Sequence, residues 1–508
     1  MPPSRPPFPP PRPEDSPLQA FRGEIRATAQ LHTQETLLIT LAGVLLCIMP
    51  WALGTMHVAS QFISLGLAAA AFVCALINRH YSGALAPQGD FKLIMWPKLI
   101  HFPLFWLGLL FLGYILVQAL NPAWVYVNNG KFWWLEPVEH ISWLPAGMET
   151  PYKDMNPWRE LTIYGGAWLL TCALWVGVTR RAAIQTLLTV VVINGSVLAI
   201  IGILQRVTRA KYILWGLKDA NTAGAFFSTI IYKNHAGAYF NLVLMLSVAL
   251  LYWHFSRAER RMERASPAPI FAFCSILLGI GVLLTFSRAG TILLMVFTLI
   301  GFIAFLVRCT VFRSEGRSPV VIILLFTIFA LFIGSGSYFL KTDEAFDRLS
   351  KLIEDGKTDS SVITRTLARN ATWDMAKDNL ITGWGAGSFR HYFPVYQRHY
   401  PEIYTVPWNK KLKMRWEYAH NDYVQLLAEV GLLGAGILAA MLACGVRHLV
   451  RTHAHLKPHL MFIVLALAIT AAHAWVDFQF HNPAILFLWC TAGALAGRWA
   501  ELENRRNV

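Results

Sequence analysis

Long apolar runs separated by polar segments dominate the chain. A helix needs about 20 mainly apolar residues to cross the hydrocarbon core of a bilayer, and most of these runs have about that length. The runs are continuous and do not alternate, which argues against a membrane β-barrel. The pattern predicts an all-α polytopic membrane protein with about 12 transmembrane helices, over residues 36–54, 58–77, 99–120, 161–179, 184–204, 235–253, 270–286, 289–307, 319–340, 423–446, 459–478 and 484–500.

The polar segments divide the chain into regions. Residues 1–35 are rich in Pro and Arg, so we expect a disordered cytoplasmic tail there. Segment 341–422 is far longer than the roughly 12–15 residues above which a loop is usually functional or disordered. Its aromatic residues and helical periodicity predict a folded, partly helical loop. The expected regions are the tail 1–35, nine spans within 36–340, the loop 341–422, three spans within 423–500 and a cytoplasmic tail 501–508.

Composition and charge support this class and orient it. Hydrophobic residues make up 55% of the sequence and charged residues only 14%, against roughly 25% in soluble proteins. Of the 44 basic residues, 22 fall in the tails, in the short segments on one side of the predicted spans, and at Arg498 near the end of the last span. Because cytoplasmic loops collect Lys and Arg, both termini are expected in the cytoplasm and the long loops on the opposite side. The net charge of +15 therefore does not indicate a nucleic-acid partner.

The predicted outer loop 121–160 is rich in tryptophan. Such residues usually form a belt at the membrane interface. Stacking on sugar rings is the alternative for the same side chains, which are Trp124, Trp133, Trp134, Trp143 and Trp158.

Arg365, Arg369 and Trp373 recur at intervals of four residues, which places them on one face of a helix. Two guanidinium groups on one face can bind phosphate oxygens in bidentate fashion. Salt bridges to Asp374 or Asp378 are the alternative, because surface arginines commonly form them.

Two further outer segments carry positive charge. Arg288 lies in the very short turn between two apolar runs, where an arginine must snorkel, pair or face a polar cavity. Lys233 and His235 flank Asn234 at the predicted start of a span. Asn234 could cap that helix, and Lys233 could place a positive charge near an anionic lipid head group.

His420 closes the large loop just before a predicted span, and its side chain can accept a proton near neutral pH. Asp422 and Gln425 have capping-box spacing, so Asp422 or its neighbour Asn421 could simply cap the helix. Glu429 falls on the same face as Asp422 and Gln425 and indicates a polar cavity. On the next span, His473 and Asp477 could line that cavity or satisfy each other.

Together these segments resemble the O-antigen ligase and polymerase superfamily of bacterial envelope glycosyltransferases. The resemblance covers residues from about 190 to 495. It rests on His420-Asn421-Asp422-Tyr423 with the run from Gln425 to Gly434, on Arg369-Asn370-Ala371-Thr372-Trp373 with Gly383-Trp384-Gly385, on Ser287-Arg288-Ala289-Gly290, on Lys233-Asn234-His235-Ala236-Gly237 and on Asp477-Phe478.

The resemblance implies transfer of a glycan from undecaprenyl diphosphate to an acceptor hydroxyl, without metal, nucleotide or other cofactor. It assigns His420 as the essential loop histidine, and Arg288 and Arg369 as the arginines of the pyrophosphate. It implies a multi-pass protein of the bacterial inner membrane whose active site faces the periplasm. The remaining candidates for substrate binding are Arg365, Lys233, His235, Asp422, Gln425, Glu429, Trp373 and Asp477.

Several reactions fit the same residues. Ligation to lipid A-core is favoured slightly, and polymerisation of lipid-linked repeat units and glycosylation of protein differ from it only in the acceptor. A polytopic solute transporter is an alternative of another class. Transporters favour broken helices and charges at mid-membrane, whereas the polar groups of this chain gather at the outer ends of the predicted spans.

Overall fold

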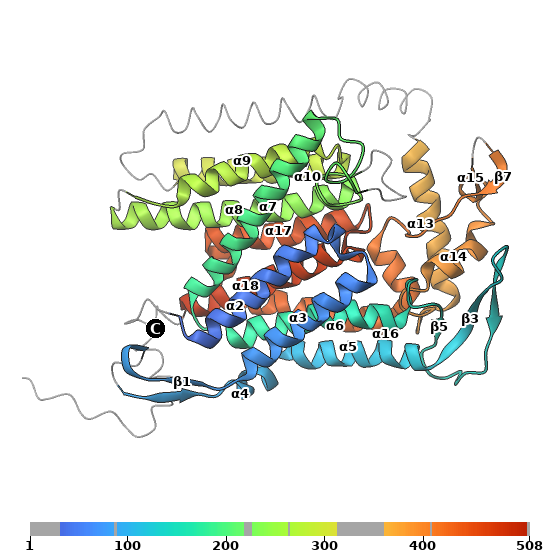
Figure 1. Ribbon diagram of the computed structural model, residues 1–508, viewed down its shortest axis with the longest axis horizontal. Helices are drawn as coiled ribbons and strands as arrows, with labels where there is room; N and C mark the ends of the chain where they lie inside the picture. The colour runs from blue at the N-terminus through green and yellow to red at the C-terminus, as the bar shows by residue number, and fades with distance from the viewer. Residues whose placement is uncertain are drawn as a thin grey trace, which may run out of the picture.

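The structure is a computed structural model that describes residues 31–85, 89–217, 226–262, 265–311, 360–406 and 409–504. These residues are mainly helical, and most of the helices lie side by side in an elongated bundle (Figure 1). Six of the described helices are long and apolar enough to cross a membrane. The chain is therefore a multi-pass helical membrane protein, as the sequence predicts. The total of about 12 spans stays a prediction, because the run 319–340, most of the tail 1–35 and residues 341–359 lie outside the described residues.

The bundle helices follow the apolar runs. Several of them begin with a proline, which suits a helical first position because its missing N–H has no partner there. The helices are α2 (Thr33–Trp51), α3 (Val58–Leu76), α5 (Pro103–Leu120), α6 (Pro157–Gly177), α7 (Arg181–Val207), α8 (Lys233–Arg261), α9 (Ala268–Leu284), α10 (Arg288–Val311), α16 (Asp422–Arg451), α17 (Pro458–Ala474) and α18 (Pro483–Asn504), with the short α4 (Trp96–Ile100) before α5.

Helix α8 is the most buried of the candidate spans. Its most apolar stretch is 83% buried, whereas the corresponding stretches of the other five candidate spans are 22–50% buried. It packs against α7, α9 and α17. The outer helices leave large apolar side chains exposed along much of their length. That distribution is expected for a bundle that buries one shared core and presents its outer faces to lipid.

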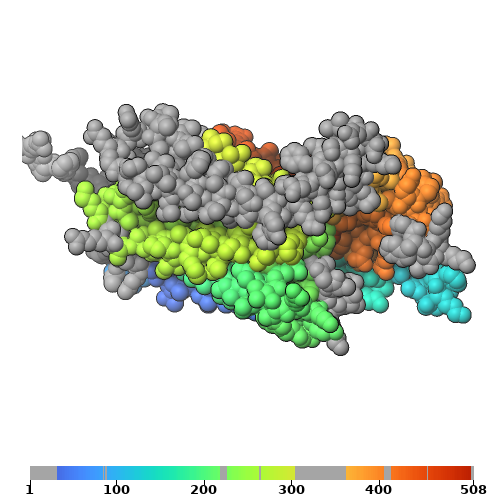
Figure 2. Space-filling model, turned by 90° about the horizontal axis from the view of Figure 1, so that it is seen from above, coloured from blue at the N-terminus to red at the C-terminus, as the bar shows by residue number. Residues whose placement is uncertain are grey.

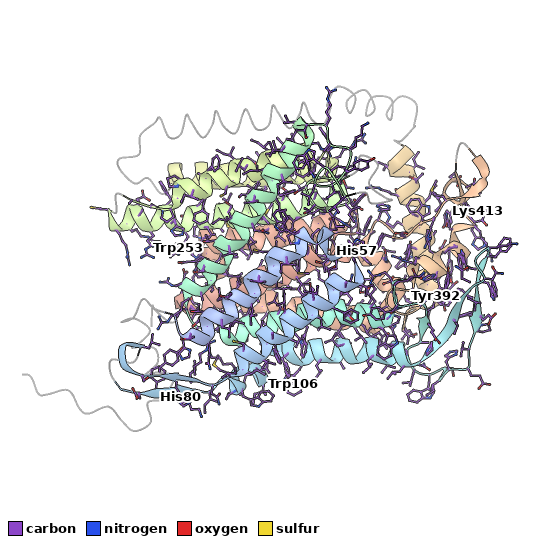
Figure 3. The ribbon with its side chains drawn as sticks, viewed as in Figure 1. His57, His80, Trp106, Trp253, Tyr392 and Lys413 are labelled. Carbon is purple, nitrogen blue, oxygen red and sulfur yellow. The ribbon has the colours of Figure 1, made fainter. Side chains whose placement is uncertain are left out.

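Successive helices run in opposite directions, so the polar segments collect at two ends of the bundle. We call the end that carries residues 122–149 and 360–421 the loop end. The opposite end, where α2 begins and α18 finishes, is the far end. The loops lie together in Figure 2, where residues 360–421 are mostly orange and residues 122–149 are cyan. Tyr392 and Lys413 lie at the loop end, and His80 and Trp253 lie toward the far end (Figure 3).

The far end brings together, within the described residues, basic segments that the sequence predicts on one side of the membrane. Arg79 after α3 donates to Glu35 of α2 and to the carbonyl of Gly177 at the end of α6. Arg498 of α18 donates to the carbonyl of Val178. The predicted grouping of these segments agrees with the fold, and their cytoplasmic location stays a prediction.

The prediction of an all-α chain is wrong for the loops, which contain three small sheets. In the tryptophan-rich loop, β3 (Pro122–Asn128) pairs antiparallel with β4 (Trp133–Pro137) and parallel with β5 (Gly147–Glu149). Aromatic and β-branched residues such as Trp124, Val125 and Val127 favour extended backbone. The other sheets pair β1 (Arg79–Tyr81) with β2 (Phe91–Leu93) and β6 (Thr405–Val406) with β7 (Asn409–Lys413).

The described part of the large loop is folded and partly helical, as predicted. It contains α13 (Ser360–Asp378), α14 (Phe389–Gln397) and the short α15 (Pro401–Tyr404). The loop has its own apolar core, in which Ala371 and Met375 of α13 meet Phe389 and Phe393 of α14. This core holds α13 against the start of α16.

A glycine turn joins α13 to α14 and is locked against a break in α16. Gly431 has a φ of 63° and interrupts the helix, and Gly383 has a φ of 70°. A Cβ on Gly383 would lie 2.4 Å from the carbonyl oxygen of Glu429. The two segments exchange backbone hydrogen bonds, including Gly385 N to Glu429 O at 2.8 Å and Leu432 N to Leu380 O at 2.8 Å. The glycine turn therefore fixes the large loop on the bundle.

Candidate active site

The imidazole of His420 lies at the loop end, directly before α16. Its Nδ1 is 2.8 Å from Oδ1 of Asp477, which follows α17. His420 has a φ of 52°, a left-handed conformation that is uncommon for a residue other than glycine and occurs frequently at functional sites. The carboxylate is fully buried, whereas the imidazole is 21% exposed. The Nε2 atom of His420 has no hydrogen bond within the described parts of the chain.

Asp477 is the polar centre of this site. Its second oxygen accepts hydrogen bonds from the hydroxyl of Tyr232 at 3.2 Å and from the amide of Asn234. Arg365 of α13 lies 3.9 Å from the same oxygen. Burial alone would raise the pKa of Asp477, but His420 and Arg365 hold it well below its usual range. The carboxylate is therefore ionised at neutral pH and holds the imidazole in one orientation.

Phe478 forms the apolar side of the site. Its ring stacks on Tyr418 with a centroid distance of 4.2 Å and on Tyr232 with 5.1 Å. His420 and His235 meet the same ring edge-on at 4.9 and 4.8 Å. The three rings form one stack with Phe478 in the middle, so the site has a Tyr232 side and a Tyr418 side.

Positive charges gather on the Tyr232 side of this stack. Lys233 is half-buried, and it is close enough to Arg206, Arg288 and Arg365 to interact electrostatically with all three. Arg206 ends α7 and donates to the carbonyls of Leu284 and Phe226. Like charges held this close favour an anionic ligand between them. Four cations from four separate helices therefore form a candidate anion site.

A second histidine–carboxylate pair lies beside the first. Nδ1 of His481 is 2.6 Å from Oδ1 of Asp422, and Phe480 N donates to the other oxygen at 2.9 Å. Nε2 of His481 is 2.9 Å from the amide nitrogen of Gln425, whose oxygen accepts from Ala419 N. This amide favours a neutral ring, but charge–charge interactions are stronger than a neutral hydrogen bond. Against the effect of burial, Asp422 raises the pKa of His481 to about 9.

The predicted interpretation of Asp422 as a helix cap is therefore wrong. The cap is Asn421, whose side-chain oxygen accepts from the amides of Tyr423 and Val424. The amide of Asn421 is also bound to the carbonyl of Trp475. Asn421 is thus held where it can cap, while the carboxylate of Asp422 turns toward His481. The expected polar face is confirmed, because Asp422, Gln425 and Glu429 are all buried and Gln425 donates to Glu429.

Three other predicted side-chain interactions differ from those in the structure. Asn234 does not cap α8, because its amide is bound to Asp477 and Tyr232. Asp374 accepts from Tyr400 and pairs with Lys377, and Asp378 accepts from Tyr396, so neither acid pairs with Arg365. His473 is buried but forms no side-chain hydrogen bond to Asp477.

The arginine that lies close to the His420–Asp477 pair is Arg365, which the sequence suggested only by its helical spacing. Arg369 lies one turn later on α13, and no contact within the described residues joins it to His420 or Asp477. Trp373 is 45% exposed. His235 is buried and contacts the carbonyl of Phe478 through Nε2. Sequence reasoning missed Arg206, whose position at the end of an apolar run is typical of an ordinary flanking charge.

Residues 273–439 match the family described as O-antigen ligase. No curated protein matches the chain. The family match confirms the resemblance to the O-antigen ligase and polymerase superfamily, and it supports a glycosyltransferase of the ligase or polymerase type. The matched region contains Arg288, Arg365, Arg369 and His420, whereas Asp477, Lys233 and Arg206 lie outside it.

Proposed function

We propose that this protein transfers a glycan from undecaprenyl diphosphate to an acceptor hydroxyl at the periplasmic face of the bacterial inner membrane. The observation that carries the proposal is the His420–Asp477 pair beside a cluster of four cations. Among the possible acceptors, lipid A-core is favoured, which would make the protein an O-antigen ligase. The family match over residues 273–439 supports the reaction type.

The cation cluster would bind the diphosphate of the donor. Arg365 and Arg288 supply guanidinium groups suited to phosphate oxygens, and Lys233 adds a mobile point charge. When the bond between the sugar and the phosphate breaks, negative charge concentrates on the departing diphosphate. Fixed cations in a partly buried site stabilise that charge more than water does. Arg369 lies on the same helix as Arg365 and could contact a more distant part of the lipid-linked substrate.

His420 would act as the general base. Asp477 holds Nδ1, which leaves Nε2 to accept the proton of the acceptor hydroxyl. The hydroxyl oxygen then forms a bond to the anomeric carbon as the carbon–oxygen bond to the diphosphate breaks, and that electron pair stays on the phosphate oxygen. Attack on the side opposite the leaving group inverts the anomeric carbon. The proton on the imidazolium is afterwards released to water, and the carboxylate of Asp477 stabilises the charge in the interval.

Two alternatives share this geometry, namely polymerisation of lipid-linked repeat units and glycosylation of a protein hydroxyl. A solute transporter is less well supported, although the break of α16 at Gly431 is a feature that transporter helices also have. The break is filled by the carbonyls and amides of the segment Leu380–Gly385, so it fixes a loop. The histidine and the cations lie at helix ends, where a membrane-bound substrate would reach them.

Replacing His420 tests the proposal. His420→Ala should lower glycan transfer by about 10²–10⁴-fold, the usual contribution of a general base. Binding of undecaprenyl diphosphate should be unchanged, because the cations remain. The matched control is His399→Ala, which removes an exposed histidine from the same loop. Undiminished surface glycan in cells that carry only the His420→Ala protein would contradict the assignment.

The glycan profile of a deletion strain separates the acceptors. A ligase should leave lipid-linked polymer that is not transferred to lipid A-core. A polymerase should leave single repeat units, and a protein glycosyltransferase should leave surface polysaccharide intact but unmodified proteins. An unchanged envelope with altered solute uptake would favour the transporter.

A further inference from the structure

A narrow polar recess lies on the Tyr418 side of the aromatic stack, away from the cation cluster. It is formed where the start of α6, the glycine turn, α14 and α16 meet. Gln425, Glu429 and His481 line one side of it. Glu160, Arg390 and Tyr418 complete its polar lining, and neither the sequence motifs nor the mechanism proposed above gives any of these three a role.

Glu160 is the clearest sign that the recess is built for a ligand. The residue is 5% exposed, yet its carboxylate forms no hydrogen bond or ion pair with any described residue. Its neighbour Arg159 is engaged elsewhere, by Gln61 and the carbonyls of Lys153 and Met56. The carboxylate oxygens of Glu160 are not fully shielded from solvent, and no described donor occupies them, so they are available to a hydrogen-bond donor of a ligand.

Two donors face the same space without partners. The hydroxyl of Tyr418 has no hydrogen bond in the described residues, and burial raises the pKa of Tyr418, so the group keeps its proton. The guanidinium of Arg390 lies over the Tyr418 ring at 5.8 Å, and no described carboxylate pairs with it. The recess therefore offers one free acceptor and two free donors. A ligand that both donates and accepts hydrogen bonds would satisfy all three, and adjacent hydroxyl groups do so.

The negative charge around the recess disfavours anionic ligands. Glu160, Glu417 and Glu429 line it together with Arg390 and His481, and Arg415 pairs with Glu417 at 3.9 Å. The ionised carboxylates among them would repel phosphates and acidic sugars. The diphosphate therefore belongs on the Tyr232 side of the stack, near Lys233. A group held on the Tyr418 side lies opposite the leaving group, which is the direction from which an inverting reaction receives its acceptor.

We propose that this recess binds adjacent hydroxyl groups of an uncharged sugar ring of the acceptor. The inference rests on the proposed function and adds the substrate class of its acceptor side. Glu160 accepts a hydroxyl hydrogen bond, and Arg390 and Tyr418 donate to hydroxyl oxygens. Because the recess as it stands is too narrow for a water molecule, Arg390 must move off the Tyr418 ring to admit the sugar. The sugar then occupies the side of Phe478 opposite the cations, with its reacting end toward His420.

The test measures binding of two kinds of probe to the full chain in lipid nanodiscs. The first probes are methyl glycosides of glucose, galactose, mannose and rhamnose, followed by saturation-transfer NMR, with methyl glucuronoside as the acidic comparison. At least one neutral glycoside should bind, and the glucuronoside should not. Glu160→Gln, which keeps the side-chain shape, should weaken the neutral glycoside about 10-fold or more, as expected for a lost hydrogen bond to a charged group.

Arg390→Gln should have a similar effect and provides a second variant if Glu160→Gln does not fold. Glu149→Gln is the matched control, because it removes an exposed carboxylate from the neighbouring β5. Equal binding of the glycosides to the wild type and both recess variants would overturn the inference. So would absence of binding by every neutral glycoside, or preferential binding of the glucuronoside.

The second probe, undecaprenyl diphosphate, separates this inference from the proposed function. Its affinity should be unchanged in Glu160→Gln and reduced in a Lys233→Ala, Arg365→Ala double variant. If undecaprenyl diphosphate binds the wild type as expected but the recess variants bind glycosides as tightly as the wild type does, only the inference about the acceptor subsite is wrong. If the wild type does not bind it at all, the proposed transferase function fails whatever the recess binds.

Discussion

The two ends of the bundle use buried charge in different ways. At the far end, Glu35 and Arg79 are both fully buried, and they face each other at 3.2 Å. The carboxylate also accepts from Thr179 and from the amide of Arg180, and Arg79 donates to Gly177. At the loop end, by contrast, the carboxylate of Glu160 and the Nε2 of His420 have no partner among the described residues.

The difference separates charges that hold the protein together from charges that await a ligand. At the far end each charge has the other as its partner and the carboxylate of Glu35 is fully hydrogen-bonded, although Nε of Arg79 has no partner among the described residues. A buried charge without a partner costs free energy, and such a cost persists in a protein where function requires it. We therefore expect far-end substitutions to change stability and loop-end substitutions to change transfer.

The largest expected effect is at Asp477. Asp477→Asn removes the negative charge that orients His420 and stabilises its protonated form, so the transfer rate should fall by about 10²–10⁴-fold. The rate of purified protein in nanodiscs measures this effect. Thermal stability is the control, since the amide can keep the hydrogen bonds from Tyr232 and Asn234. A loss of stability that accounts for the whole loss of rate would contradict a catalytic role.

At the far end, Glu35→Ala leaves Arg79 buried without its counter-charge. Breaking a buried pair in this way usually costs about 3–5 kcal/mol, so the free energy of unfolding should fall by that amount. Unfolding in mixed micelles provides the measurement. The double variant Glu35→Leu, Arg79→Leu should regain most of the loss. Transfer per folded molecule should equal that of the wild type, and a selective loss of transfer would remove the distinction between the two ends.

The smallest effect concerns the His481–Asp422 pair. The pKa of His481 is raised to about 9, compared with about 6.5 in an unfolded chain. The contribution to stability is therefore complete below about pH 6.5 and is lost as the pH rises through 9. It amounts to about 3 kcal/mol at most. Unfolding midpoints between pH 6 and 10 should decline in the wild type and stay flatter in His481→Gln. Parallel curves for the two proteins would rule out this pair as the cause.

Much of the bundle was predictable because a long apolar run in the sequence directly indicates a membrane helix. The turn between α9 and α10 and the folded large loop also agree with the predictions. The strands β3 and β4 were missed, because a tryptophan-rich segment was interpreted from its composition and not from its alternation. The break in α16 was missed as well. It depends on Gly383 and Gly431 meeting across residues far apart in the chain.

For the site, the predictions identified the residue types more reliably than their partners. His420, Arg365, Lys233 and Asp477 do come together, whereas no contact among the described residues joins Arg369 to His420 or Asp477. The cap predicted at Asn421 is confirmed, and those at Asp422 and Asn234 are wrong. Capping is a local rule, and both side chains instead bind residues that lie more than fifty positions away. The roles of Arg206 and Glu160 could not be predicted, because a single charge at the end of an apolar run has no distinctive local pattern.

The sequence by itself determined the class of this protein: its helical spans and the order of its motifs are properties of consecutive residues. Only the tertiary structure decided which charges satisfy one another and which face a shared space. The physical reason is that a membrane span requires a run of consecutive apolar residues. Hydrogen bonding and charge pairing, by contrast, act over a few ångströms between segments that can lie far apart in the sequence. Glu35 and Glu160 each lie near the start of an apolar run, and their surroundings alone give one a partner and leave the other free.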